Sequence, residues 1–143
     1  DAADPIGINV FAGNNKATIV TDTGVISDNI LRRIDDTTLL VLEANYDPHM
    51  LRFGPYQPFL KQRVASDEGH LSNEMAAQAL LMMKRPNFMQ VILAHRSENN
   101  NNAVLVTQTI GKMLVDGGVR IGPEMKLQHG QPNEIVSIQS VKR

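Results

Sequence analysis

The stretch Ser66-Asp67-Glu68-Gly69-His70-Leu71-Ser72-Asn73-Glu74 joins a histidine to the start of the clearest helix in the chain. Ser72 is a good N-cap because its hydroxyl can accept a hydrogen bond from a free amide of the first helical turn. Apolar residues then recur at helical spacing until Lys84-Arg85-Pro86 stops the pattern: Met75, Ala76, Ala79, Leu80 and Met83. We therefore expect a helix that packs one face on a sheet, with His70 exposed in the preceding loop and facing a cleft.

Length and composition bound the class of protein. With 143 residues, 42% of them hydrophobic, the chain can bury a core and most simply forms one domain. The net charge of -1 excludes a strong overall field for nucleic acid or an anionic membrane. The absence of cysteine excludes disulfides and thiolate metal sites. No apolar run approaches the ~20 residues that cross a bilayer, and no signal peptide opens the chain, so we expect a soluble, cytoplasmic protein without a membrane partner.

Short apolar strands alternate with helices, which predicts an α/β (α+β) fold with a mixed sheet flanked by helices. The pattern favours an irregular loop over residues 46–58, with room for about one turn of helix, because three prolines occur there. The predicted strands cover 8–11, 16–21, 38–42, 90–94, 124–127 and 134–138, and the first two form a hairpin. The predicted helices cover 27–34, 59–64, 72–83 and a segment that the asparagines 99–102 cap and the glycines 117–118 end.

Ionisable residues follow three of these strands. Asp22, Glu43 and His95 each stand where an apolar strand ends, and carboxyl ends of strands gather functional groups at one sheet edge. Asp22 and His95 are suitable ligands for zinc or manganese, whereas Glu43 with His70 could form a carboxylate–imidazole pair that moves a proton. Two ligands do not make a metal site, and a structural salt bridge or a capping role would explain the acids almost as well. We expect His49 and His129 to be surface residues.

Five short motifs, in this order, closely resemble the C-terminal part of metallo-β-lactamase-fold hydrolases of the YycJ/WalJ type, which are distant relatives of nucleic-acid phosphodiesterases. The resemblance covers nearly the whole chain and predicts one part of an αββα sandwich. The motifs are Thr21-Asp22-Thr23-Gly24, Leu42-Glu43-Ala44-Asn45-Tyr46-Asp47, Leu60-Lys61-Gln62-Arg63-Val64, residues 66–74 and Leu93-Ala94-His95-Arg96-Ser97-Glu98-Asn99-Asn100.

The resemblance implies a role for each residue of this group. Asp22 looks like the aspartate that bridges two divalent metals, zinc or manganese, and His95 looks like the last metal-binding histidine. Glu43 stands where relatives orient a catalytic histidine, and His70 stands where that histidine steadies the scissile phosphate and protonates the leaving oxygen. Tyr46 departs from the pattern, because many relatives have a histidine there. The implied reaction uses a hydroxide activated by two metals to cleave a phosphodiester, with 5′-3′ DNA exonuclease activity as the expectation.

The departure from this family is large, because the His-x-His-x-Asp-His signature and one further histidine would lie upstream of Asp1. We therefore expect residues 1–143 to be the C-terminal part of one domain, inactive alone. Such a part would leave an apolar sheet face open for its missing N-terminal half, for a partner chain, or for a swapped second copy. DNA is an expected partner, although the chain shows no obvious aromatic and basic stacking platform, having no tryptophan and only two tyrosines. The alternative is a metal-free binding or structural module of the same fold.

Overall fold

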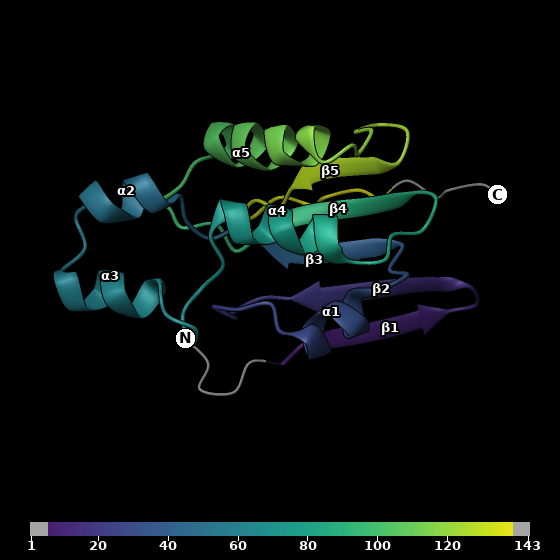
Figure 1. Ribbon diagram of the computed structural model, residues 1–143, viewed down its shortest axis with the longest axis horizontal. Helices are drawn as coiled ribbons and strands as arrows, with labels where there is room; N and C mark the ends of the chain where they lie inside the picture. Colours follow the sequence, from purple (N-terminus) through teal and green to yellow (C-terminus); the bar gives the residue numbers. More distant parts are fainter. Residues whose placement is uncertain (1–5, 139–143) are drawn as a thin grey trace.

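The computed structural model describes residues 6–138 and consists of a five-stranded sheet with five helices (Figure 1). No helix within these residues is long and apolar enough to cross a bilayer. The elements, in chain order, are β1 (Ile8–Ala12), β2 (Asn15–Val20), α1 (Asp28–Ile34), β3 (Leu39–Glu43), α2 (Pro48–Phe53), α3 (Pro58–Val64), α4 (Asn73–Met82), β4 (Met89–Ala94), α5 (Ala103–Asp116) and β5 (Met125–His129).

The strands lie in the order β1-β2-β3-β4-β5, so neighbours in the sheet are also neighbours in the sequence. β1 and β2 form the predicted antiparallel hairpin, and every other pair is parallel. Residues Val20 and Leu42 are register partners, as are Glu43 and Ala94. Strands β2, β3 and β4 therefore end almost level, which brings the residues that follow them to one edge.

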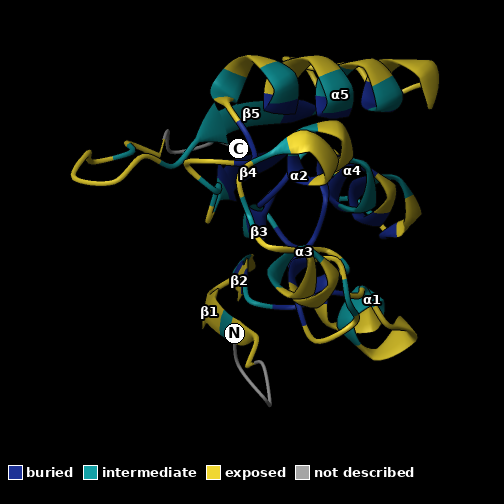
Figure 2. Ribbon diagram, turned by 90° about the vertical axis from the view of Figure 1, so that its left-hand side faces the viewer, coloured by how far each residue is buried: buried dark blue, intermediate teal, exposed yellow. Residues whose placement is uncertain are grey.

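Helices α1, α4 and α5 cover one face of the sheet, as the end-on view in Figure 2 shows. The main core lies between them and the sheet, and it includes Leu40, Leu42, Val91 and Leu80, all buried. The predicted caps are confirmed. The side chains of Ser27, Ser72 and Asn102 accept from backbone amides at the starts of α1, α4 and α5.

The opposite face of the hairpin is open within the described residues. Ile8 and Ile19 are register partners and therefore point to the same side, and both are exposed, as is Val10. Side chains alternate along a strand, so this apolar row faces away from the helices. The expected uncovered apolar face is present at the hairpin, whereas Ile92, aligned with Ile19 through Val41 on the same side of the sheet, is buried.

Two segments differ from the sequence predictions. The loop expected at 46–58, with room for about one turn of helix, contains the six-residue helix α2, because Asp47 caps it and Pro48 occupies its first position, where a missing amide costs nothing. The strand expected at 134–138 does not form. Its Ile135 is 96% exposed and the described residues offer this segment no pairing strand, so its apolar pattern alone cannot hold it extended in a sheet.

Candidate active site

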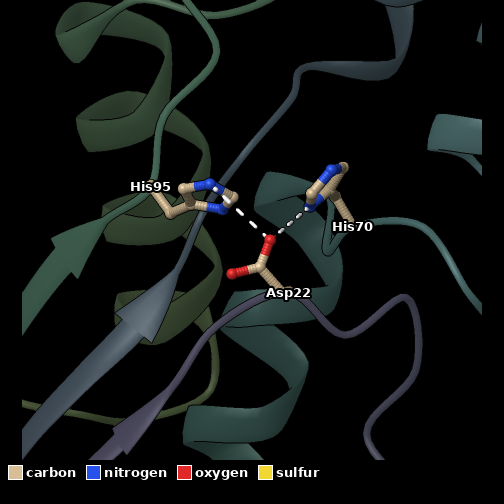
Figure 3. Close-up of side chains that lie close together, drawn as sticks. All are labelled: Asp22, His70 and His95. Atoms are coloured by element: carbon tan, nitrogen blue, oxygen red, sulfur yellow. Dashed lines mark ion pairs between the residues drawn. The ribbon is translucent and has the colours of Figure 1, made fainter. Parts of the chain in front are cut away.

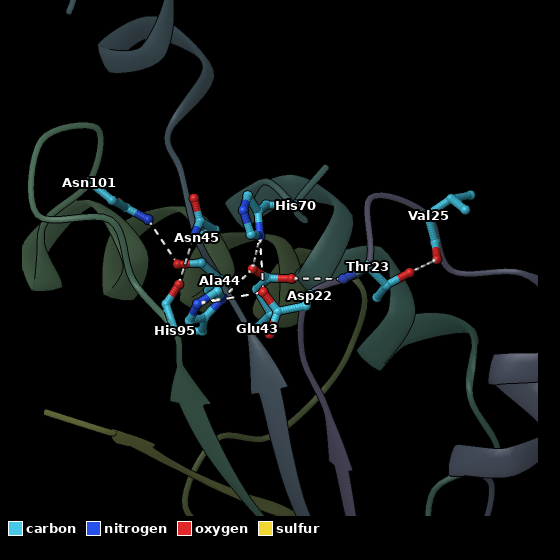
Figure 4. Close-up of polar contacts among 9 residues, drawn as sticks. All are labelled: Asp22, Thr23, Val25, Glu43, Ala44, Asn45, His70, His95 and Asn101. Carbon is cyan, nitrogen blue, oxygen red and sulfur yellow. Dashed lines mark hydrogen bonds and ion pairs between the residues drawn. The ribbon is translucent and has the colours of Figure 1, made fainter. Parts of the chain in front are cut away.

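The structure brings together all four residues singled out in the sequence (Figure 4). Asp22 follows β2, Glu43 ends β3, His95 follows β4, and His70 lies two residues before the N-cap of α4. Asp22 and His95 have backbone φ angles of 58° and 52°, in the left-handed region that aspartate and histidine tolerate better than most residues. Each strand therefore turns sharply at the residue that carries the functional side chain.

Glu43 is the centre of the cluster. It is 0% exposed, and its Oε1 lies 2.7 Å from the Nδ1 atoms of both His70 and His95. The backbone amide of Thr23 donates to Oε2 at 3.3 Å. Burial opposes ionisation of this carboxyl, but the hydrogen bonds from the two histidines outweigh it and place the pKa of Glu43 below its ordinary value. An ionised carboxylate only accepts, so each histidine carries a proton on Nδ1 and leaves Nε2 as its basic nitrogen.

Asp22 and the two histidines point toward one another (Figure 3). Oδ1 of Asp22 lies 3.7 Å from His95 Nε2 and 4.0 Å from His70 Nδ1. One potential ligand atom from each residue lies within 4.8 Å of the others. The hydrogen bond to Glu43 raises the pKa of His95, although burial works against it. The geometry thus unites residues that the sequence had divided into a metal pair and a proton-transfer pair.

His70 is buried, with 9% of its surface exposed, so the prediction of an exposed histidine is wrong. Its backbone amide donates to the carbonyl of Val64 at 2.9 Å, and that of Gly69 donates to Ser66 at 2.8 Å. These bonds fold the loop beneath α3 and direct His70 toward Glu43. Its imidazole still lines a cleft of about 250 Å³, as the sequence analysis expected, together with Asp22, Asn45, Tyr56, Leu60, Val64, His95 and Ser97.

Gly24 is where the loop after β2 touches the loop of His70. Its amide donates to the carbonyl of Asp67 at 3.2 Å, and an added Cβ would lie 2.0 Å from the carbonyl oxygen of Ser66. Backbone atoms cannot swing aside, so one of the two loops would have to move. This contact fixes Asp22 relative to His70.

Gly24→Ala is therefore expected to lower the free energy of unfolding by about 1–3 kcal/mol, measured by urea denaturation. Gly111→Ala is the matched control, because Gly111 lies within helix α5 and an added Cβ would meet only the side chain of Ile121, at 3.9 Å. The control should stabilise the protein by up to about 1 kcal/mol through better helix propensity. Equal stability of the two variants would contradict the proposed close contact.

Asn45 and Arg96 are site residues that sequence reasoning did not single out. Asn45 donates from Nδ2 to the carbonyl of His95 at 2.8 Å and accepts at its own carbonyl from the amide of Ser97 at 2.9 Å, which holds the turn after β4. Its place two residues after Glu43 was the available signal. Arg96 lines a neighbouring cavity of about 590 Å³ on the other side of His95, and its buried Nη1 has no hydrogen-bond partner among residues 6–138.

The other two histidines lie outside the cluster. His49 is exposed on α2, as expected, where its ring lies 4.6 Å from that of Phe53. His129 was predicted to be a surface residue, but it is half-buried at the end of β5, and its Nε2 lies 2.9 Å from Thr107 Oγ1. Burial, and then the nearby Arg96, lower the pKa of His129. The packing of β5 against α5 explains the difference.

The donor set fits a divalent cation. Aspartate oxygen and imidazole nitrogen are ligands of zinc and manganese, and a metal-binding histidine commonly donates its other ring N–H to a carboxylate, as His95 does to Glu43. Asp22, His70 and His95 are the three candidate ligands among the described residues. Three donors suffice for one ion with an open position, and a pair of ions would need further ligands.

The pKa shifts predict how the metal-free protein responds to pH. The folded-state pKa of Glu43 lies below 4.5, so its contribution to stability is complete above 4.5 and is lost as pH falls through that lower pKa. The folded-state pKa of His95 lies above 6.5, so its contribution is complete below 6.5 and is lost as pH rises through that higher pKa. The difference in unfolding free energy between wild type and Glu43→Gln should thus be largest between pH 4.5 and 6.5. Chemical denaturation in chelator tests it, and a difference that does not vary with pH would contradict it.

Comparison with known proteins identifies relatives for nearly the whole chain. It is 33% identical over 141 residues to the protein named exodeoxyribonuclease YycJ of Bacillus anthracis. The aligned region covers 99% of this chain and 53% of that protein. It is 32% identical over 133 residues to exodeoxyribonuclease WalJ of Streptococcus pneumoniae, covering 93% and 49%. The chain thus spans about half the length of the curated relatives it matches.

The metallo-β-lactamase fold protein YhfI from Bacillus subtilis has a similar structure. The TM-score is 0.56 at 12% sequence identity, and the similarity covers 87% of this chain and 41% of that one. This likeness confirms the fold expected from the sequence motifs. No family model matches the sequence.

Proposed function

We propose that this chain is the C-terminal part of a metal-dependent phosphodiesterase acting on DNA. Its similarity to the YycJ and WalJ proteins and its share of a metallo-β-lactamase fold support this proposal. The reaction is hydrolysis of the phosphodiester nearest a 5′ end. The observation that supports it most is the meeting of Asp22, His70 and His95 around the buried carboxylate of Glu43. Burying a charged carboxylate costs free energy, and a binding module that performs no chemistry has no need of a buried carboxylate shared by two histidines.

Asp22 and His95 would hold the cation, through a carboxylate oxygen and Nε2 that already lie 3.7 Å apart. When bound, a pair of zinc or manganese ions supplies an acidified water and neutralises charge on the phosphate. The positive φ angles at both residues fit this role, because strained backbone at strand ends persists where it aims a functional group.

Glu43 would act through the two imidazoles. By accepting from both Nδ1–H groups it fixes their ring orientation and tautomer, so that His95 presents Nε2 toward Asp22. His70, at the wall of the cleft, would act as an imidazolium: its Nε2–H would donate to a phosphate oxygen and then give its proton to the leaving oxygen, while Nδ1–H stays on Glu43. Arg96 offers a cationic donor to the phosphate backbone on the far side of His95.

The remaining metal ligands would come from sequence upstream of Asp1, or from a partner chain. The open face around Ile8, Val10 and Ile19 is the surface such a segment, or a swapped second copy, would cover. The proposal therefore makes the 143-residue chain inactive alone, since Asp22, His70 and His95 cannot hold two ions.

The test compares residues 1–143 with the full-length protein that contains them. Metal content is measured after dialysis, and cleavage of 5′-labelled duplex DNA is followed by gel electrophoresis. We expect two ions and release of 5′ nucleotides for the full-length protein, and neither for the shorter chain. A tightly held pair of ions on the shorter chain would contradict the proposed division of ligands, and full-length protein that leaves DNA intact with either metal would contradict the activity.

A further inference from the structure

Helices α2 and α3 form an arm, residues 48–64, that lies beyond the carboxyl edge of the sheet (Figure 1). A small core of its own attaches it to the rest of the molecule. Tyr46, Leu51 and Val64 are buried there, and Tyr56 and Leu60 pack against them. Tyr46, which stands where many relatives have a histidine, therefore packs in this small core.

Two phenylalanines are exposed on this arm. Phe53 is 67% exposed and Phe59 is 71% exposed, although large aromatic side chains usually gain much from burial. The guanidinium carbon of Arg52 lies 5.4 Å from the ring centroid of Phe53, within the range of a cation–π contact. Tryptophan is absent and tyrosine is scarce, so no aromatic and basic platform is evident in the sequence. Folding supplies one from phenylalanines.

The arm is also a locally basic segment of a slightly acidic chain. Residues 48–64 contain Arg52, Lys61 and Arg63 and no acidic residue, whereas the whole chain has a net charge of -1. Lys61 Nζ donates to the carbonyl of Arg52 at 2.7 Å, which ties the two helices together and holds both cations on one segment. Cations interleaved with exposed rings fit a polyanion whose bases can stack.

The arm reaches the candidate active site. Tyr56, Leu60 and Val64 line the same cleft as His70 and His95. A DNA strand whose terminal phosphodiester lies at that cleft would therefore continue along the arm. A nucleic acid carries one phosphate per nucleotide, so neighbouring phosphates would fall near the basic side chains.

We propose that the arm binds a single strand of DNA, with Phe53 and Phe59 stacking on unpaired bases and Arg52 and Lys61 contacting phosphates. The inference rests on the proposed function for the choice of DNA as ligand. It goes further by assigning the surface that grips the substrate and by requiring that the strand be unpaired next to the site. Stacking tolerates every base, so binding on this surface is independent of sequence.

The experiment measures binding of fluorescently labelled 12-nucleotide oligo(dT) to the full-length protein by anisotropy, with chelator present so that cleavage cannot occur. Phe53→Ala and Phe59→Ala should each weaken binding about 10-fold. Arg52→Gln should lower the slope of log Kd against log salt by about 1. Phe11→Ala is the matched control, because Phe11 is 70% exposed and lies beside Lys16, but on β1. It should bind as wild type.

Wild-type binding by both arm variants, or an equal loss in Phe11→Ala, would overturn the proposal. So would a change of oligomeric state in the arm variants with DNA binding unchanged, since the arm would then be a protein interface. Hydrolysis of a small phosphodiester by the metal-loaded wild type reports on the proposed function separately. Binding that depends on the arm, without such hydrolysis, would leave the arm assignment standing and reject the enzyme.

Discussion

Replacing Glu43 by glutamine is expected to lower the turnover of DNA cleavage by the full-length protein about 100-fold. The carboxylate accepts three N–H groups, two from Nδ1 of His70 and His95 and one from the amide of Thr23. A glutamine of the same size has one acceptor oxygen, so its NH2 group must face at least one of these donors. An NH2 group at the Oε1 position would oppose both Nδ1–H groups, and at the Oε2 position it would oppose the Thr23 amide. The site therefore loses at least one hydrogen bond and, in either orientation, the negative charge that both imidazoles share.

The same variant should change the titration of His95 in the metal-free protein. Its pKa should fall, because the hydrogen bond to Glu43 is the main cause of its raised value and burial alone lowers it. NMR titration of the imidazoles measures this without reference to activity. Glu98→Gln is the matched control, since Glu98 is exposed and lines the cavity beside His95. Turnover by Glu43→Gln equal to that of the control would contradict the assigned role.

Most of the helices and strands could be predicted from the sequence, because the capping residues and the apolar pattern agree with the packing. Ser72 and Asn102 stand where helices start, and apolar runs stand where strands are buried. In a parallel arrangement those runs must end at one edge, so the meeting of Asp22, Glu43 and His95 could be expected from the sequence alone. The parallel strand order is therefore what makes this part of the site predictable.

What could not be predicted depends on contacts between distant segments. Glu43 was expected to pair with His70 alone, yet its Oε1 also binds His95, 52 residues further along the chain. His70 was expected to be exposed because loops usually are, but its burial follows from that same shared carboxylate and from the fold of its loop beneath α3. Periodicity contains no information on either contact.

Segment 134–138 shows the opposite failure. Its β-branched residues Ile135, Val136 and Ile138 are typical of a strand, but a strand needs a partner, and the described residues offer none beside it. Helix α2 was underestimated because three nearby prolines suggested a loop, although Pro48 is compatible with a first helical position after Asp47. Whether a proline interrupts a helix or begins one depends on its position within the helix.

Replacing Asp22 by asparagine is expected to reduce metal binding by the full-length protein about 100-fold or more and to remove measurable DNA cleavage. Asp22 supplies the carboxylate oxygen that lies 3.7 Å from His95 Nε2 and within 4.8 Å of the candidate ligand atom of His70. A neutral amide keeps the shape and the left-handed backbone, which asparagine also tolerates, but it removes the negative charge that a divalent cation requires. Isothermal titration with zinc or manganese, after exhaustive chelation, measures the loss.

Asp67→Asn separates this effect from a general change of charge. Asp67 is exposed in the loop of His70 and contacts Gly24 through its backbone carbonyl, which the substitution leaves intact. The control makes the same change of charge in the adjoining loop and should bind metal as wild type does. If Asp22→Asn retained wild-type affinity while still folding, the cation would not lie between Asp22 and His95. The hydrogen bonds of Glu43 would then serve to position histidines for proton transfer alone, because they do not depend on Asp22.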